Sequence, residues 1–151
     1  MNSGLVLLVA PFLLALSGFS SAQGQPCSCG SGTMVNSAAN IATLLGGKTV
    51  CASLGTDKWQ EYHAGTTPAV GTLTDYKKGP NDPVDPSKVV GSWSATGSGT
   101  SSRVVYNYGA GGTYQYQVCQ NGSSLNLCGA STGGVNVVGA SLVNGSGGCG
   151  F

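Results

Sequence analysis

Apolar and polar residues alternate along most of the stretch from Val104 to Leu127. A period of two is typical of strands that bury one face. A glycine cluster at 109–112 and the pair Asn121-Gly122 interrupt the alternation. Both are turn signals, because glycine and asparagine tolerate a positive φ. The pattern therefore predicts a three-stranded antiparallel meander.

The register of this meander follows from the requirement that apolar side chains share one face. A first loop with an odd number of residues, over 109–113, sets Tyr106 against Tyr116, whereas a two-residue loop opposes apolar to polar positions. We therefore expect a glycine-bulged first turn. A two-residue second turn at Asn121-Gly122 then sets Leu127 against Tyr116, and the sheet gains a tyrosine-rich inner face.

The rest of the chain predicts one short helix and further strands. Asn36 is suited to cap a helix over 37–45 that ends at Gly46-Gly47. Proline and asparagine make the segment 77–88 a loop. The remaining strands are expected at 48–54, 70–76, 89–96 and 135–143, the last with a bulge at Gly139. The fold class is therefore mainly β: a small antiparallel sheet or sandwich of about six to seven strands, with one short N-terminal helix and disulfide staples.

The N-terminus has the pattern of an export signal. The apolar run 5–19 is shorter than the roughly 20 residues that cross a bilayer, so no stable membrane span is expected. Small residues at 20–22 follow it. We interpret 1–22 as a signal peptide and 23–151 as a single β-rich domain of a secreted, extracellular or cell-surface protein.

The cysteine count fits an oxidising compartment, because an even number behind a leader is typical of disulfides. The chain has 6 cysteines, for which the favoured links are Cys128–Cys149 and a bond from Cys51 to Cys27 or Cys29. All six are expected to be bonded: Cys27, Cys29, Cys51, Cys119, Cys128 and Cys149.

Charge is confined to the middle of the chain. The 6 basic and 5 acidic residues all lie between Lys48 and Arg103, and residues 104–151 have none. Without a basic patch, nucleic-acid binding is not expected. Edge strands are normally protected by charge, so an uncharged β ribbon suits a surface that another copy covers.

No motif predicts an enzyme, a metal or a cofactor. The match to Gly-x-Ser-x-Gly at 129–133 leads into a strand, and the only histidine, His63, precedes the serine, so the order of a catalytic triad is absent. Asp57, Glu61 and His63 are too few for a zinc site, and we interpret them as a solvated polar face. The loop residues Asp75, Asn81, Asp82 and Asp85 carry oxygen ligands suited to calcium but lack EF-hand spacing.

Two resemblances bear on the family. Gly91-Ser92-Trp93 looks like the Gly-x-Trp that opens a lipocalin, but too few residues follow for an eight-stranded barrel, so we interpret Trp93 as a core residue at a strand start. The segments 49–51, 59–63, 75–80, 84–86 and 90–93, with the tyrosine meander and Gly148-Cys149-Gly150, resemble a pattern in small exported bacterial proteins of unknown function. That resemblance implies export and a bacterial source.

Two hypotheses for function follow. The favoured one is an exported structural subunit that assembles with itself into an extracellular fibre or pilus-like filament, a homopolymer joined by strand addition. Its candidate contact is the last strand, with Val135, Val137, Val138, Ala140, Leu142 and Val143. The alternative is a secreted module that stacks a glycan or small ligand on aromatic residues. Its candidates are Trp59, Tyr62, Tyr76 and Trp93, together with Tyr106, Tyr108, Tyr114 and Tyr116.

Overall fold

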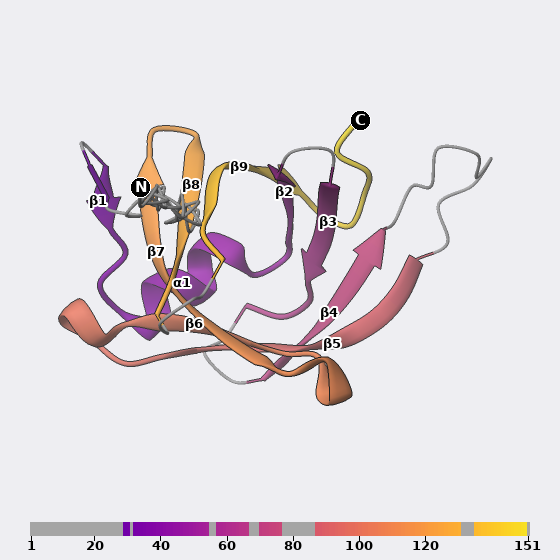
Figure 1. Ribbon diagram of the computed structural model, residues 1–151, viewed down its shortest axis with the longest axis horizontal. Coiled ribbons are helices and arrows are strands. Elements are labelled where there is room, and N and C mark those ends of the chain that lie inside the picture. The colour runs from indigo at the N-terminus through magenta and orange to yellow at the C-terminus, as the bar shows by residue number, and fades with distance from the viewer. Residues whose placement is uncertain are drawn as a thin grey trace, which may run out of the picture.

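The computed structural model describes residues 29–30, 32–54, 57–66, 70–76, 87–130 and 135–150 (Figure 1). The expected signal peptide, 1–22, lies outside these ranges. The elements are β1 (Thr33–Met34), α1 (Ala38–Leu45), β2 (Lys48–Leu54), β3 (Asp57–His63), β4 (Gly71–Tyr76), β5 (Ser87–Thr96), η1 (Gly99–Ser101), β6 (Arg103–Asn107), η2 (Gly109–Gly111), β7 (Thr113–Asn121), β8 (Ser124–Gly129) and β9 (Val137–Asn144).

Eight of the strands close into an antiparallel barrel. Their order is β7-β6-β5-β4-β3-β2-β9-β8, and β8 pairs back onto β7. The chain is mainly β as expected, but closure corrects the expectation of an open sheet or sandwich with fewer strands. Two features were not predicted from the sequence. The segment that forms β3 was interpreted as a solvated polar face rather than as a strand, and alternation along a chain does not say whether the outermost strands meet.

The meander forms with the predicted faces and a different register. Its first turn is an odd loop over 108–112, with Gly109 and Gly112 at positive φ. Tyr106 pairs with Tyr114 rather than Tyr116, and the second turn falls at Gly122-Ser123, one residue later than expected. Each correction moves the pairing by two residues, so the inner face is unchanged, because side chains alternate with a period of two.

Helix α1 closes one end of the barrel. Ser37, rather than the expected Asn36, caps it by accepting a hydrogen bond from the Asn40 backbone N–H at 3.1 Å. Ile41 and Leu45 are fully buried among residues of the barrel interior, and the helix contacts β2, β5 and β6. Figure 1 shows α1 inside the outline that the curved sheet encloses. No helix within the described ranges is both long and apolar enough to cross a membrane.

Strand β9 is an interior strand of the ring. Its residues Val137 to Ser141 pair with β8 on one side, and Ser141 to Asn144 pair with β2 on the other. The bulge predicted at Gly139 is confirmed: φ there is 73°, and the β8 register shifts between Leu125 and Leu127. Both halves of the candidate self-assembly strand are therefore already paired within the molecule, on opposite sides, and only a short part of each edge is left for strand addition.

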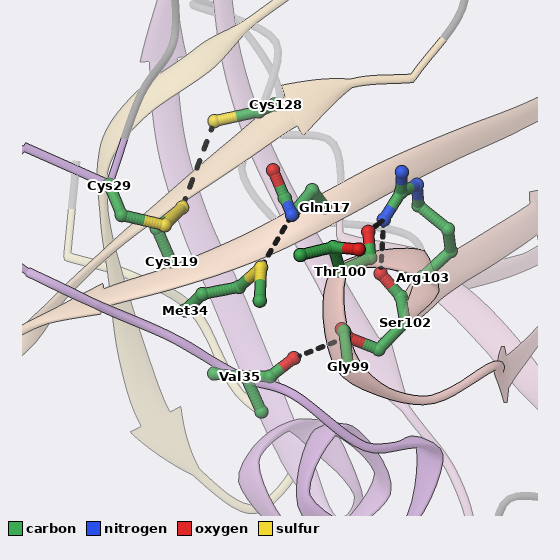
Figure 2. The surroundings of a disulfide bond; sticks show 10 residues. All are labelled: Cys29, Met34, Val35, Gly99, Thr100, Ser102, Arg103, Gln117, Cys119 and Cys128. Carbon is green, nitrogen blue, oxygen red and sulfur yellow. Dashed lines mark hydrogen bonds between the residues drawn. A yellow bond between two sulfur atoms is a disulfide. The ribbon is translucent and has the colours of Figure 1, made fainter.

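The disulfides correct both favoured pairings. The bonds are Cys29–Cys119 and Cys51–Cys149 (Figure 2 for the first). Cys128 is also disulfide-bonded, and its sulfur lies 4.0 Å from that of Cys119; Cys27 is outside the described ranges. Cys149 reaches Cys51 because the tail after β9 runs beside β2 and β3, where the Cys149 backbone N–H donates to the Gln60 side chain. Sequence spacing does not reveal this crossing.

The segment before α1 is fastened to the barrel by hydrogen bonds as well as by Cys29–Cys119. The Val35 backbone N–H donates to the Val118 carbonyl at 2.9 Å. The fully buried Ser102 hydroxyl donates to the Val35 carbonyl at 2.7 Å (Figure 2). These contacts hold the entry to α1 against β7 and so help to fix the closed end.

Candidate functional site

The barrel interior has a cavity of about 450 Å³ at the end away from α1. The β6–β7 turn, including Gly111, lines this cavity, whereas the start of α1 is bonded to the β5–β6 turn, where Ala38 donates to Gly97. Successive turns of an up-and-down barrel lie at opposite ends. Aromatic rings and two carboxylates distinguish its lining: Trp59, Tyr106, Tyr108, Tyr114, Tyr116, Glu61 and Asp75. The other lining residues are aliphatic or glycine.

Strand β3 brings polar residues into the interior. Trp59 and Glu61 line the cavity, and His63 on the same face is fully buried. This corrects the interpretation of the segment as a solvated polar face. In a strand, alternate residues share a face, so His63 lies on the same side as Trp59 and Glu61. The register sets Glu61 directly opposite Asp75 of β4, so both carboxyl groups project inward.

The tyrosines of the meander form a continuous array of rings. Ring centroids are 5.7 Å apart between Tyr106 and Tyr116, 6.3 Å between Tyr106 and Tyr108, and 5.9 Å between Tyr108 and Tyr114. Edge-to-face and tilted contacts at these distances are favourable for aromatic rings. The array gives one side of the cavity an aromatic wall.

Glu61 is held by the Tyr108 hydroxyl, which lies 2.9 Å from each carboxylate oxygen. Burial, followed by the negative charge of Glu61, raises the pKa of Tyr108, and the same two causes raise the pKa of Tyr106 and Tyr116. These hydroxyls therefore stay protonated at neutral pH. The tyrosine wall adds no negative charge of its own.

His63 and Tyr106 form a buried layer beneath the cavity. Burial lowers the pKa of His63 to about 4, so the ring is neutral. Its Nδ1 lies 3.0 Å from the Glu61 backbone carbonyl, which only accepts, so Nδ1 carries the proton. Nε2 then accepts from the Tyr106 hydroxyl at 3.0 Å. This tautomer fixes the orientation of the Tyr106 ring at the cavity floor.

The four residues predicted as a stacking surface do not come together. Trp59 lines the cavity, but Trp93 is 1% exposed, and its indole N–H donates to the Ala64 carbonyl. Tyr62 and Tyr76 alternate with the inward-facing Glu61 and Asp75, which directs them to the outer face. Trp93 is thus the core residue that the sequence predicted, but it lies inside β5 rather than at the start of a strand.

The rings that line the cavity are those of Trp59 of β3 and of four tyrosines of the meander and its turn. All five were among the aromatic candidates from the sequence, but they were not separated from Tyr62, Tyr76 and Trp93. The signal that could have grouped them is the alternation in Asp57–His63, which places Trp59 and Glu61 on one face once the segment is taken as a strand.

The other candidate sites from the sequence are not observed within the described ranges. Among those residues, no group of three or more His, Cys, Asp and Glu side chains is placed to hold a metal ion. Asn81, Asp82 and Asp85 of the oxygen-rich loop lie outside those ranges, as does Ser131 of the Gly-x-Ser-x-Gly match.

Comparison of the chain with protein-family models, curated proteins and solved structures finds no match. The resemblance to small exported bacterial proteins stays a prediction.

Proposed function

We propose that this chain is an exported binding module that holds a small organic ligand in the open end of its barrel. The cavity lined by Trp59 and four tyrosines carries the proposal. Ligand sites are typically concave, mostly apolar and aromatic, with a few polar groups that fix orientation. A volume of about 450 Å³ lies within the range of such sites.

The walls of this cavity are suited to a preformed site. Each barrel strand that contributes to it is hydrogen-bonded to a neighbour on both sides. The ring contacts within the meander and the hydrogen bond from the Tyr106 hydroxyl to His63 restrict the rotamers of the lining side chains. Binding therefore has little side-chain ordering to offset, which favours affinity for a small ligand.

Self-assembly into a fibre, the other hypothesis from the sequence, is supported less well. It was motivated by an uncharged ribbon whose last strand could add to a neighbour's sheet. The pairing of β9 with β8 over Val137–Ser141 and with β2 over Ser141–Asn144 weakens that motive. Exposed Val138 and Val143 remain on the surface, but a fibre built on them would need contacts between faces rather than strand addition.

Isothermal titration calorimetry with a panel of glycans and small neutral, cationic and anionic aromatic molecules tests the binding proposal. We expect saturable binding of at least one class, weakened about two- to tenfold by Trp59→Ala, because an aromatic stacking contact contributes about 0.5–1.5 kcal/mol. Tyr62→Ala, on the same strand but the outer face, is the matched control and should bind like the parent chain. A panel without any binder, or equal losses in both variants, would contradict the proposal.

A further inference from the structure

The pair Asn-Gly occurs twice in the chain, at Asn121-Gly122 and at Asn144-Gly145, and a serine follows each pair. The residues of both pairs are exposed. We infer that Asn121 is a site of self-modification by deamidation in the folded protein, whereas Asn144 is protected. The site is independent of the proposed binding function. It lies in the β7–β8 turn, at the opposite end of the barrel from the β6–β7 turn that lines the cavity.

Deamidation at an Asn-Gly pair is a cyclisation followed by hydrolysis. The backbone nitrogen of the glycine loses its proton to solvent and attacks Cγ of the asparagine. A carbon–nitrogen bond forms, the Cγ–Nδ2 bond breaks, and ammonia leaves with a proton taken from water. Water then opens the cyclic imide at one of its two carbonyls, which leaves aspartate or isoaspartate. Glycine favours the reaction because it has no side chain beside the attacking nitrogen.

The β7–β8 turn leaves the attacking nitrogen available. Gly122 and Ser123 form the two-residue turn between the paired residues Asn121 and Ser124. Within the described part of the chain, the Gly122 N–H makes no hydrogen bond. A Cβ added at Gly122 would meet no other atom within 4 Å, so the space beside this residue is open to the cyclic imide.

A hydrogen bond to the same peptide unit makes this nitrogen more acidic. The Ser124 hydroxyl donates to the Asn121 backbone carbonyl at 2.9 Å. That carbonyl and the Gly122 N–H are conjugated, so a donor on the oxygen withdraws electron density from the nitrogen. Because the deprotonated nitrogen is the species that attacks, Ser124 should accelerate the cyclisation.

The second Asn-Gly pair has its glycine nitrogen bonded. The Gly145 N–H donates to the Gly47 carbonyl at 2.9 Å. The Gly145 carbonyl accepts from the hydroxyl of the fully buried Thr49 at 2.8 Å. The space beside Gly145 is as open as that beside Gly122, so crowding does not distinguish the two pairs. The hydrogen bond does, because it must break before the Gly145 nitrogen can attack.

The reaction changes the charge of the β7–β8 turn. Residues 104–151 contain no charged side chain, so aspartate or isoaspartate at position 121 adds a negative charge to this stretch. Isoaspartate also lengthens the backbone by one carbon at the end of β7, where Asn121 pairs with Ser124. The turn therefore changes with the age of the protein.

Ageing of the intact folded protein at neutral and mildly alkaline pH tests the inference. Because residues 104–151 contain no lysine or arginine, the aged protein is digested with pepsin in acid, and mass spectrometry measures deamidation at each asparagine. We expect Asn121 to react about two- to tenfold faster than Asn144, the factor that one protein hydrogen bond contributes. Ser124→Ala should slow the reaction of Asn121 about twofold and leave that of Asn144 unchanged.

The control is the same chain unfolded in urea with its disulfides reduced, in which the two rates should converge. Equal rates in the folded protein, or a faster reaction at Asn144, would overturn the inference. A difference of the same size in urea would overturn it as well, because the neighbouring residues in the sequence rather than the fold would then cause the difference.

Discussion

The two ends of the barrel interior are built from different side chains. At the α1 end, Ile41, Leu45, Val118 and Leu125 are at most 1% exposed and pack into one aliphatic core. At the other end, rings and carboxyl groups surround an open cavity, and Tyr114 is 46% exposed. An eight-stranded barrel is just wide enough for its own side chains to fill. Adding a helix at one end therefore closes that end completely.

Because of this difference, stability depends mainly on the helix end of the barrel and the proposed binding function on the open end. Buried aliphatic side chains at the helix end lose all contact with water on folding and so supply most of the hydrophobic free energy. Some side chains at the open end, such as Tyr114, are only partly dehydrated and contribute less. The open end is thus free to carry groups that would be unfavourable in a core, such as two opposed carboxyl groups.

Truncation of one side chain at each end tests most directly whether the two ends differ in packing. Ile41→Ala should lower the free energy of unfolding by about 2–5 kcal/mol, because it leaves a cavity in a packed core. Tyr114→Ala should cost about 1 kcal/mol or less, because its ring is partly exposed. Urea unfolding under non-reducing conditions measures both. Equal costs would mean that the two ends do not differ in packing.

The layer between the two ends should respond to pH. The pKa of His63 falls from 6.5 to about 4 on folding, so the unfolded chain binds more protons between these values. Stability is therefore fully present above pH 6.5 and decreases as the pH falls toward 4. Between about pH 7.5 and pH 4.5, the parent chain should lose about 2–3 kcal/mol through this group.

The control for this pH effect is His63→Gln, which cannot titrate. Its unfolding free energy should change less over the same interval, whatever its stability at pH 7.5. Because other carboxyl groups contribute to both proteins, the difference between the two pH slopes is the quantity to measure. Parallel slopes would show that His63 titrates alike in the folded and unfolded chains.

The smallest effect is expected at the open end. Tyr108→Phe keeps the ring and removes the hydroxyl that donates to Glu61, so we expect a loss of about 1 kcal/mol or less. Tyr62→Phe, with its side chain on the outer face, provides the baseline in the same thermal or urea unfolding series. A loss as large as that of Ile41→Ala would show that the open end is a structural core after all.

Much of the fold could be predicted from the sequence because alternation and turn residues act locally. The helix over 37–45, the strand 48–54, the odd first turn and the bulge at Gly139 all follow from neighbours within a few residues. Closure of the barrel and the bond Cys51–Cys149 could not be predicted. Both depend on which distant strands meet, and no local pattern encodes that.

Only part of the candidate site could be predicted from the sequence, for the same reason. The tyrosine wall could be predicted, since it lies within one meander of consecutive strands. Its partners Trp59, Glu61 and Asp75 come from β3 and β4, and the polar residues of β3 concealed its alternation. His63 illustrates the error best: a lone histidine in a charged stretch looks solvated, yet here it is fully buried and bonded to Tyr106.

Closure of the barrel also determines at which stage the uncharged stretch 104–151 is prone to aggregate. Once the ring is complete, each strand in this stretch is paired with neighbours within the same molecule. A nascent or reduced chain has no such partners, and nothing in these residues repels a second nascent copy. Aggregation is therefore a risk during synthesis and folding rather than for the folded protein. Expression without oxidative folding should lead to inclusion bodies.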